Sequence, residues 1–214
     1  MTWAKTTAIV LAAGEGKRMN SDKAKQYLKL DDRPMIYYSL KAFEDSQVNE
    51  IILVTRASDI EMCKKIIVSY NLKKVISIVE GGKERYESVY RGLKAIEKTD
   101  YVLIHDGARP FISKDLIKKT IEAVKQYNAC LVGVPVKDTI KIINNNDFIE
   151  ETPDRKQLWA AQTPQAFDFT SIKEAYESLI QEGYEKREKM TDDAMVYEEY
   201  LKRPVKMICG SYRN

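Results

Sequence analysis

The chain has 214 residues, a length that allows one α/β domain with a sizeable hydrophobic core. Hydrophobic residues make up 44% and charged residues 31%, which is typical of a globular protein and excludes disordered and collagen-like classes. Lysine and arginine number 35 against 32 acidic residues, so the net charge of +3 is too even for a nucleic-acid partner or an anionic membrane, and phosphate affinity must be local.

The cysteines and the N-terminal region indicate the cellular compartment in which the protein works. Cys63, Cys130 and Cys209 are odd in number and far apart, so they indicate reduced, mostly buried thiols rather than a disulfide framework or a paired zinc site. The first apolar run ends at Ala13, which is too short for a transmembrane helix or a signal peptide. We therefore expect a cytoplasmic protein without a membrane partner.

Apolar runs of strand length alternate with amphipathic stretches of helix length, as in βαβ units around a mostly parallel sheet. The predicted strands are 7–12, 50–55, 75–79, 101–105, 129–134 and 205–209, and the predicted helices are 34–45, 60–70, 85–98, 114–127, 170–181 and 191–201. Ser113, Thr170 and Thr191 are the expected N-caps of the last three helices. The pattern predicts one α/β domain over residues 1–214.

Residues 139–150 break this alternation. Apolar and polar residues alternate there on both sides of an Asn-rich turn, which predicts a β-hairpin. Ile140, Ile142, Phe148 and Ile149 would be exposed on a projecting hairpin, so we expect an arm at about 136–158 that packs against a second subunit. Packing of the hairpin back on its own domain stays open as the alternative.

The loop after the first strand is rich in glycine and cations. Gly14 and Gly16 would admit phosphate oxygens to the backbone, and Arg18 and Lys25 would donate to them. Met19 stands where a dinucleotide-binding fingerprint requires its third glycine, and Thr55 replaces the acidic residue that ends its second strand. A Walker phosphate loop is excluded as well, because its Gly-Lys must be followed by Ser or Thr and its first glycine is replaced here by a leucine. A glycine turn with solvated basic side chains remains open at this point.

Later loops add further candidates. Asp106 ends the fourth strand, and a carboxylate facing a triphosphate needs an intervening cation, which makes it a candidate ligand of Mg²⁺ or of a ribose. Arg85 and Ser88 lie three residues apart on one helical face. Arg155 could hold a phosphate by two hydrogen bonds from its guanidinium group. His105 is the only histidine and is expected to pack rather than to catalyse, because a phosphate oxygen attacks phosphorus without a base.

Eight short blocks, taken together in order and spacing, resemble the 2-C-methyl-D-erythritol 4-phosphate cytidylyltransferase family over nearly the whole chain. The blocks are Leu11-Ala-Ala-Gly-x-Gly-x-Arg-Met, Lys25-Gln-Tyr, Gly81-Gly-x-x-Arg-x-x-Ser, His105-Asp-Gly-Ala-Arg-Pro, Asp138-Thr139, Asp154-Arg155, Gln162-Thr-Pro-Gln and Thr191-Asp-Asp-Ala. The resemblance implies a Rossmann-like α/β fold of nucleotidyltransferase type and an Mg²⁺-dependent reaction of CTP with methylerythritol phosphate that releases diphosphate. It also implies a homodimer locked by exchanged arms.

The resemblance further implies roles for individual residues. Arg18, Lys25 and Arg155 would be catalytic, the first two by stabilising charge on the α-phosphate, and Asp106 would bind the metal. The residues around CTP would be Ala12, Ala13, Gly14, Gly16, Gly82, Arg85, Ser88, Asp106 and Gly107. Arg109 would hold the methylerythritol phosphate together with Thr139 and Arg155 of the neighbouring subunit; family members often carry alanine at the position of Gly107.

The family's sequences continue past the position of Asn214 with a further lysine that helps to place the phosphates. We therefore expect either a truncated sequence or a chain without that cation. Two alternative functions stay open: a ribitol 5-phosphate cytidylyltransferase, and a nucleotide-binding form with impaired catalysis.

Overall fold

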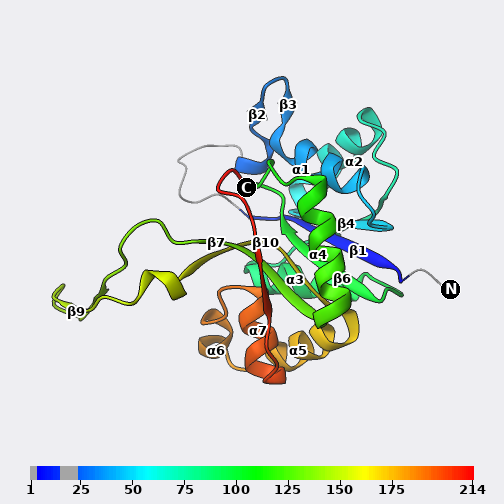
Figure 1. The fold of residues 1–214 in the computed structure, drawn as a ribbon. Helices are drawn as coiled ribbons and strands as arrows, with labels where there is room; N and C mark the ends of the chain where they lie inside the picture. The colour runs from blue at the N-terminus through cyan, green and yellow to red at the C-terminus, as the bar shows by residue number, and fades with distance from the viewer. Residues whose placement is uncertain (1–3, 15–23) are drawn as a thin grey trace.

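The computed structural model describes residues 4–14 and 24–214. A seven-stranded sheet with the order β11-β7-β10-β6-β1-β4-β5 forms its centre (Figure 1). The strands are β1 (Thr6–Ala12), β4 (Glu50–Thr55), β5 (Val75–Glu80), β6 (Tyr101–Asp106), β7 (Ala129–Pro135), β10 (Trp159–Asp168) and β11 (Lys206–Cys209). Every ladder is parallel except the two that β10 makes with β6 and β7, so the predicted mostly parallel α/β sheet is confirmed.

Helices cover both faces of this sheet. They are α1 (Met35–Glu44), α2 (Ile60–Ser69), α3 (Arg85–Lys94), α4 (Lys114–Tyr127), α5 (Phe169–Gln181), α6 (Tyr184–Glu188) and α7 (Asp193–Leu201). Alternate strand residues face opposite ways. Val10 and Leu53 pack with α1, α2 and α4, whereas Ile9 and Ile52 pack with α3, α5 and α7. The sheet is therefore buried on both faces, which explains why its strands are almost continuously apolar.

Strand β10 is absent from the sequence-based prediction. Its residues 162–165 read Gln-Thr-Pro-Gln, a polar run with a proline that hides the strand pattern. The register of β10 against β7 shifts between Ala161 and Gln165, and the Thr163–Pro164 peptide bond in this irregularity is cis. The polar residues are tolerated because Gln162, Thr163 and Gln165 find hydrogen-bond partners outside the ladder.

The helix caps agree only in part with the prediction. Ser113 caps α4 by accepting a hydrogen bond from the backbone of the third helical residue. The expected caps Thr170 and Thr191 are wrong, because carboxylates take their place: Asp168 caps α5 and Asp192 caps α7. Asp and Thr are both good caps, so only the backbone path decides between neighbours.

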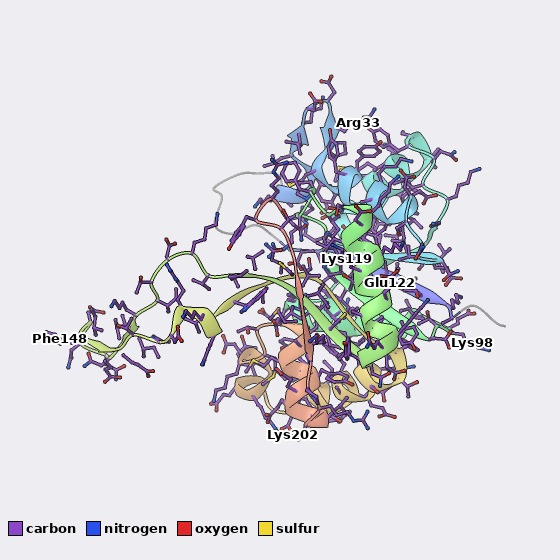
Figure 2. The ribbon with its side chains drawn as sticks, viewed as in Figure 1. Arg33, Lys98, Lys119, Glu122, Phe148 and Lys202 are labelled. Atoms are coloured by element: carbon purple, nitrogen blue, oxygen red, sulfur yellow. The ribbon has the colours of Figure 1, made fainter. Side chains whose placement is uncertain are left out.

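The predicted arm projects from the sheet between β7 and β10, and Phe148 lies at its tip (Figure 2). It contains the short hairpin of β8 (Ile142–Ile143) and β9 (Ile149–Glu151) and then η3, a 3₁₀ turn at Arg155–Gln157. Asn144 closes the turn, because its side-chain oxygen accepts from the backbone N–H groups of Asn146 and Phe148. The Asn-rich turn therefore acts as the sequence pattern predicts.

The remaining elements are small. A second hairpin pairs β2 (Lys29–Leu30) with β3 (Arg33–Pro34), and two further 3₁₀ turns are η1 (Lys25–Tyr27) and η2 (Ala57–Asp59). Within residues 4–14 and 24–214, no helix has the length and apolarity needed to cross a bilayer.

Candidate functional site

A cavity of about 730 Å³ lies beyond the carboxyl ends of β1 and β6. After β1 the chain moves outward through β4 and β5 and then returns to place β6 on the other side of β1. Such a reversal leaves a crevice at the strand ends, which is where open α/β sheets bind ligands. Leu11 and Asp106 are partners in the β1–β6 register, so both loops open into one space.

Nine of the residues singled out in the sequence line this cavity. They are Ala12, Ala13, Gly14, Lys25, Gly82, Arg85, Ser88, Asp106 and Arg109. Gly16 and Arg18 lie outside the described residues. The structure thus brings together residues from three separate loops, and their individual roles stay predictions.

The charge of the described lining is mainly positive. Five cationic side chains and two carboxylates line the cavity, namely Lys25, Lys83, Arg85, Arg109, Arg213, Glu84 and Asp106. Lys25 is exposed and makes no ion pair within the part of the chain that the structure describes. A cavity of this size and charge fits an anionic ligand such as a nucleotide.

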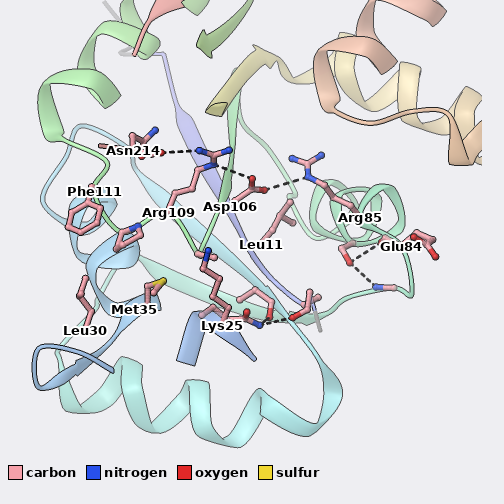
Figure 3. Close-up of a pocket in the computed structure, with 18 of the residues that line it drawn as sticks. Leu11, Lys25, Leu30, Met35, Glu84, Arg85, Asp106, Arg109, Phe111 and Asn214 are labelled. Atoms are coloured by element: carbon pink, nitrogen blue, oxygen red, sulfur yellow. Dashed lines mark hydrogen bonds and ion pairs between the residues drawn. The ribbon is translucent and has the colours of Figure 1, made fainter. Parts of the chain in front are cut away.

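Asp106 lies between two guanidinium groups (Figure 3). Its Oδ1 is 3.5 Å from Nε of Arg85 and its Oδ2 is 3.5 Å from Nε of Arg109. The backbone N–H of Asp106 donates to Thr163 Oγ1 at 3.1 Å, which fixes the end of β6 against β10. The carboxylate is 36% exposed, so a cation in the cavity can reach it.

Arg109 is held from its other side as well. Its Nη1 donates to the backbone carbonyl of Asn214 at 2.9 Å, and the Asn214 side-chain nitrogen donates to the Thr163 carbonyl at 2.8 Å. The last residues of the described chain thus meet the loop after β6 at one wall of the cavity, which also includes Arg213.

The opposite wall is the start of α3 and the loop before it. Ser88 Oγ accepts from the backbone N–H of Gly82, and the Glu87 carboxylate accepts from the N–H groups of Lys83 and Glu84. Gly81 has no room for a side chain, because a Cβ there would contact Ala13 Cβ and would lie 2.8 Å from Ser88 Oγ. The loop after β5 therefore packs directly on the loop after β1.

Gln26 holds the loop after β1 by hydrogen bonds to its backbone. Its side-chain nitrogen donates to the Ala12 carbonyl at 2.5 Å and to the Gly14 carbonyl at 3.1 Å. The buried amide therefore orients the end of the described glycine-rich stretch.

Gly107 lies behind the cavity wall rather than in it. Its N–H donates to the Leu11 carbonyl at 2.8 Å, and its own carbonyl accepts from Ser39 Oγ. A Cβ at this position would contact Ile36 Cδ1 and lie 2.9 Å from the Leu11 carbonyl oxygen. An alanine here would therefore require the β1–β6 junction of this chain to shift.

His105 is fully buried, as the sequence-based interpretation expects for a packing residue. Burial lowers its pKa from 6.5 to about 4. Its ring therefore stays neutral near pH 7 and supports the wall through hydrogen bonds to Thr163 and Arg109.

Thr139 and Arg155 are exposed on the arm and do not line the cavity of their own chain. Arg155 donates from Nη1 to the Lys137 carbonyl at 2.9 Å, which ties the two sides of the arm together at its base. Within one chain these two residues are therefore separate from the other predicted site residues.

Several lining residues escaped the sequence-based prediction. Leu30, Met35 and Phe111 form an apolar side of the cavity next to Lys25 (Figure 3). Nothing in the pattern marks them, since each is an ordinary apolar residue. Lys83 was detectable, because it lies inside the same glycine loop as Gly82.

The described residues offer no group of three or more His, Cys, Asp and Glu side chains that could enclose a metal ion. A mostly parallel sheet with a cationic cavity at its reversal point is typical of nucleotide-binding proteins of the α/β class.

Comparison with known proteins narrows this class. The sequence profile of the 2-C-methyl-D-erythritol 4-phosphate cytidylyltransferase family matches residues 6–214. A relative of that name from Lachnoclostridium phytofermentans is 49% identical over 211 residues, covering 98% of this chain and 89% of the relative. Another from Alkaliphilus oremlandii is 49% identical over 213 residues, covering 98% of this chain and 88% of the relative.

Solved structures agree with the sequence relatives. The 4-diphosphocytidyl-2C-methyl-D-erythritol synthase from Anaerococcus prevotii superposes with a TM-score of 0.87 at 33% identity, covering 99% of this chain and 91% of that one. The cytidylyltransferase from Thermus thermophilus gives a TM-score of 0.74 at 25% identity, covering 96% of this chain and 89% of that one. The chain belongs to the 2-C-methyl-D-erythritol 4-phosphate cytidylyltransferase family.

Proposed function

We propose that this enzyme joins CTP and 2-C-methyl-D-erythritol 4-phosphate to give 4-diphosphocytidyl-2-C-methyl-D-erythritol and diphosphate, a step of non-mevalonate isoprenoid synthesis. The observation that carries the proposal is a cationic cavity at the reversal point of the sheet, in a chain that belongs to this family. Because CTP is an intracellular metabolite, we also propose that the enzyme works in the cytoplasm.

The chemistry is a transfer between two anions. An oxygen of the methylerythritol phosphate forms a bond to the α-phosphorus of CTP, and the bond from that phosphorus to the bridging oxygen of diphosphate breaks. The attacking oxygen is already ionised, so no base is needed, and the main contribution of the protein is to position the anions and offset their repulsion. We assign this task to Arg18 and Lys25 at the α-phosphate and to Arg109 at the substrate phosphate.

The remaining assignments follow the walls of the cavity. The loop at Ala12, Ala13, Gly14 and Gly16 would hold the triphosphate. Gly82, Arg85 and Ser88 would surround the cytosine, and Gly107 would support the ribose side from behind Asp106.

The carboxylate of Asp106 fits a divalent cation. Mg²⁺ is often held by one or two carboxylates together with substrate phosphates, so a single exposed carboxylate facing a polyphosphate is a sufficient protein ligand. When bound, Mg²⁺ would neutralise developing charge on the triphosphate and the leaving diphosphate. The two neighbouring arginines would hold the Asp106 carboxylate oriented toward the cavity.

The arm supports a homodimer. Ile142, Ile143, Phe148 and Ile149 are between 43% and 71% exposed on a segment that leaves its own sheet. A second copy of the chain would cover this apolar surface and receive Thr139 and Arg155 at its substrate phosphate. Each cavity would then be completed by the partner.

The test is diphosphate release by the purified protein with CTP, Mg²⁺ and methylerythritol phosphate. Steady release is expected, with none when methylerythritol phosphate is omitted and little after chelation of the metal. Turnover of ribitol 5-phosphate in its place would identify the other cytidylyltransferase, and CTP binding without any release would indicate a non-catalytic nucleotide-binding form.

A matched pair of lysines tests the site itself. Lys25→Ala should lower kcat by about 100-fold, comparable with the loss of one transition-state donor. Lys29 is also exposed but does not line the cavity, so Lys29→Ala should retain near-normal activity. Near-normal turnover of a folded Lys25→Ala protein would refute the role of Lys25.

A further inference from the structure

Asp193 is a fully buried carboxylate at the start of α7, outside the cavity lining. It receives both terminal nitrogens of Arg85, with Nη1 at 2.8 Å from Oδ1 and Nη2 at 2.7 Å from Oδ2. The Tyr176 hydroxyl donates to Oδ1 at 2.5 Å. A buried carboxylate needs such partners, because burying it without hydrogen bonds or an opposite charge is strongly unfavourable.

The position of Asp193 is set by elements remote from the cavity. Gln165 of β10 accepts from the Ala194 N–H at 2.8 Å and donates to Asp192 at 3.2 Å, which docks the first turn of α7 onto the sheet. Tyr176 projects from α5 and is itself buried in the core. The carboxylate therefore cannot follow the guanidinium if Arg85 moves.

The two-pronged pairing of Arg85 Nη1 and Nη2 with the Asp193 carboxylate, here called the Arg85 fork, determines how Arg85 faces the cavity. With Nη1 and Nη2 directed at Asp193, only Nε is turned toward Asp106, at 3.5 Å from Oδ1. Burial by itself would lower the pKa of Arg85, but the charge and hydrogen bonds of Asp193, together with the charge of Asp106, raise it above its ordinary value. Without the fork, Asp106 would be the nearest carboxylate and would attract the whole guanidinium toward the centre of the cavity.

We propose that Asp193 is a positioning residue for the cytidine nucleotide: it holds the two terminal nitrogens of Arg85 at the cavity wall, so that only Nε faces Asp106, and the Tyr176 hydroxyl orients the Asp193 carboxylate. The inference rests on the proposed function, since it assigns nucleotide binding to this wall. Asp193 and Tyr176 do not line the cavity, so they act only through Arg85.

Calorimetric binding of CTP with Mg²⁺ to Asp193→Asn provides the first measurement. The amide keeps the shape but cannot hold the guanidinium by charge, so we expect the Kd for CTP to rise about tenfold or more. In turnover, the KM for CTP should rise similarly, whereas kcat and the KM for methylerythritol phosphate should change by less than about threefold. Removing a negative charge would by itself tighten the binding of an anion, so unchanged or tighter binding by the folded variant overturns the proposal.

Asp192→Asn is the matched control. Asp192 is the neighbouring carboxylate and caps α7, but among the described residues no hydrogen bond or ion pair joins it to Arg85. Asn is as good an N-cap as Asp, but its amide nitrogen cannot accept from Gln165, so the substitution should weaken the docking of α7 and leave the Kd for CTP within about twofold. A Kd raised as much as in Asp193→Asn would show that docking of α7, rather than the Arg85 fork, governs binding, and would overturn the proposal.

A double-mutant cycle separates positioning from a structural role. In an Arg85→Ala background, Asp193→Asn should change the Kd for CTP by less than about twofold, because the residue through which it acts is gone. An unreduced effect in that background overturns the proposal.

If Asp193→Asn does not fold, Tyr176→Phe enters the same cycle. Tyr176→Phe should raise the Kd for CTP about threefold, and this rise should disappear in the Arg85→Ala background. An unchanged Kd for CTP in Tyr176→Phe overturns the proposal. CTP binding is measured without the second substrate, so absence of turnover in the unsubstituted enzyme would contradict the proposed function while the binding comparison still tests Asp193.

Discussion

Acid should destabilise the folded protein through His105. The ring packs edge-on against Phe43 and has Thr163 Oγ1 at 3.0 Å from Nδ1 and the Arg109 carbonyl oxygen at 3.2 Å from Nε2. A carbonyl only accepts, so Nε2 carries the proton and Nδ1 accepts from the Thr163 hydroxyl. The Thr163 oxygen in turn accepts from the Asp106 N–H, so the hydrogen bonds of the neutral ring support the cavity floor.

The direction and size of this loss of stability follow from the pKa of the His105 ring. Burial lowers the pKa of His105 from 6.5 to about 4, against a weaker opposing effect of the Asp106 charge. The unfolded chain therefore binds a proton between pH 6.5 and pH 4 that the folded chain does not bind, and stability is lost as the pH falls through this window. At about 1.4 kcal/mol per pH unit, the full loss is about 3 kcal/mol, of which about 2 kcal/mol falls between pH 7 and pH 5.

Urea unfolding at pH 7, 6 and 5 in a chelator-containing buffer measures this loss. His105 is the only histidine, so few other side chains titrate in that range. The free energy of unfolding should fall by about 2 kcal/mol for the unsubstituted protein and by less than about half of that for His105→Gln, which has no imidazole to protonate. Equal losses in the two proteins, or ring-proton NMR signals that titrate near pH 6.5 in the folded protein, would refute the reasoning.

Three further predictions test caps, packing and assembly. Ser113→Ala should lower the free energy of unfolding by about 1 kcal/mol, because Ser113 caps α4. Thr170→Ala should change it by less than about 0.5 kcal/mol, because Asp168 rather than Thr170 caps α5. Gly81→Ala should cost about 1–3 kcal/mol in urea unfolding through overpacking, whereas Gly183→Ala, where a Cβ meets nothing within 4 Å, should cost less than about 1 kcal/mol. Phe148→Ser should shift sedimentation toward the monomer and raise the KM for methylerythritol phosphate, and an unchanged mass and KM would contradict the arm's role.

The sequence by itself determined most of the sheet and its helices. The strand predicted at 50–55 and the helix predicted at 114–127 match β4 and α4 in both bounds, because a strand buried on both faces is a continuous apolar run and an amphipathic helix has a 3.6-residue period. Strand β10 was missed, because its polar run Gln-Thr-Pro-Gln is stabilised by hydrogen bonds that form only after the chain has folded.

For the candidate site, the sequence determined which loops matter. Glycines, cations and one carboxylate after the strands mark the loops that meet at the sheet edge, because parallel strands bring their carboxyl ends together. The tertiary structure alone decided what holds these groups. Asp193 contacts Arg85 across 108 positions of sequence, and such a pairing depends on how α7 docks on β10, which no local pattern encodes.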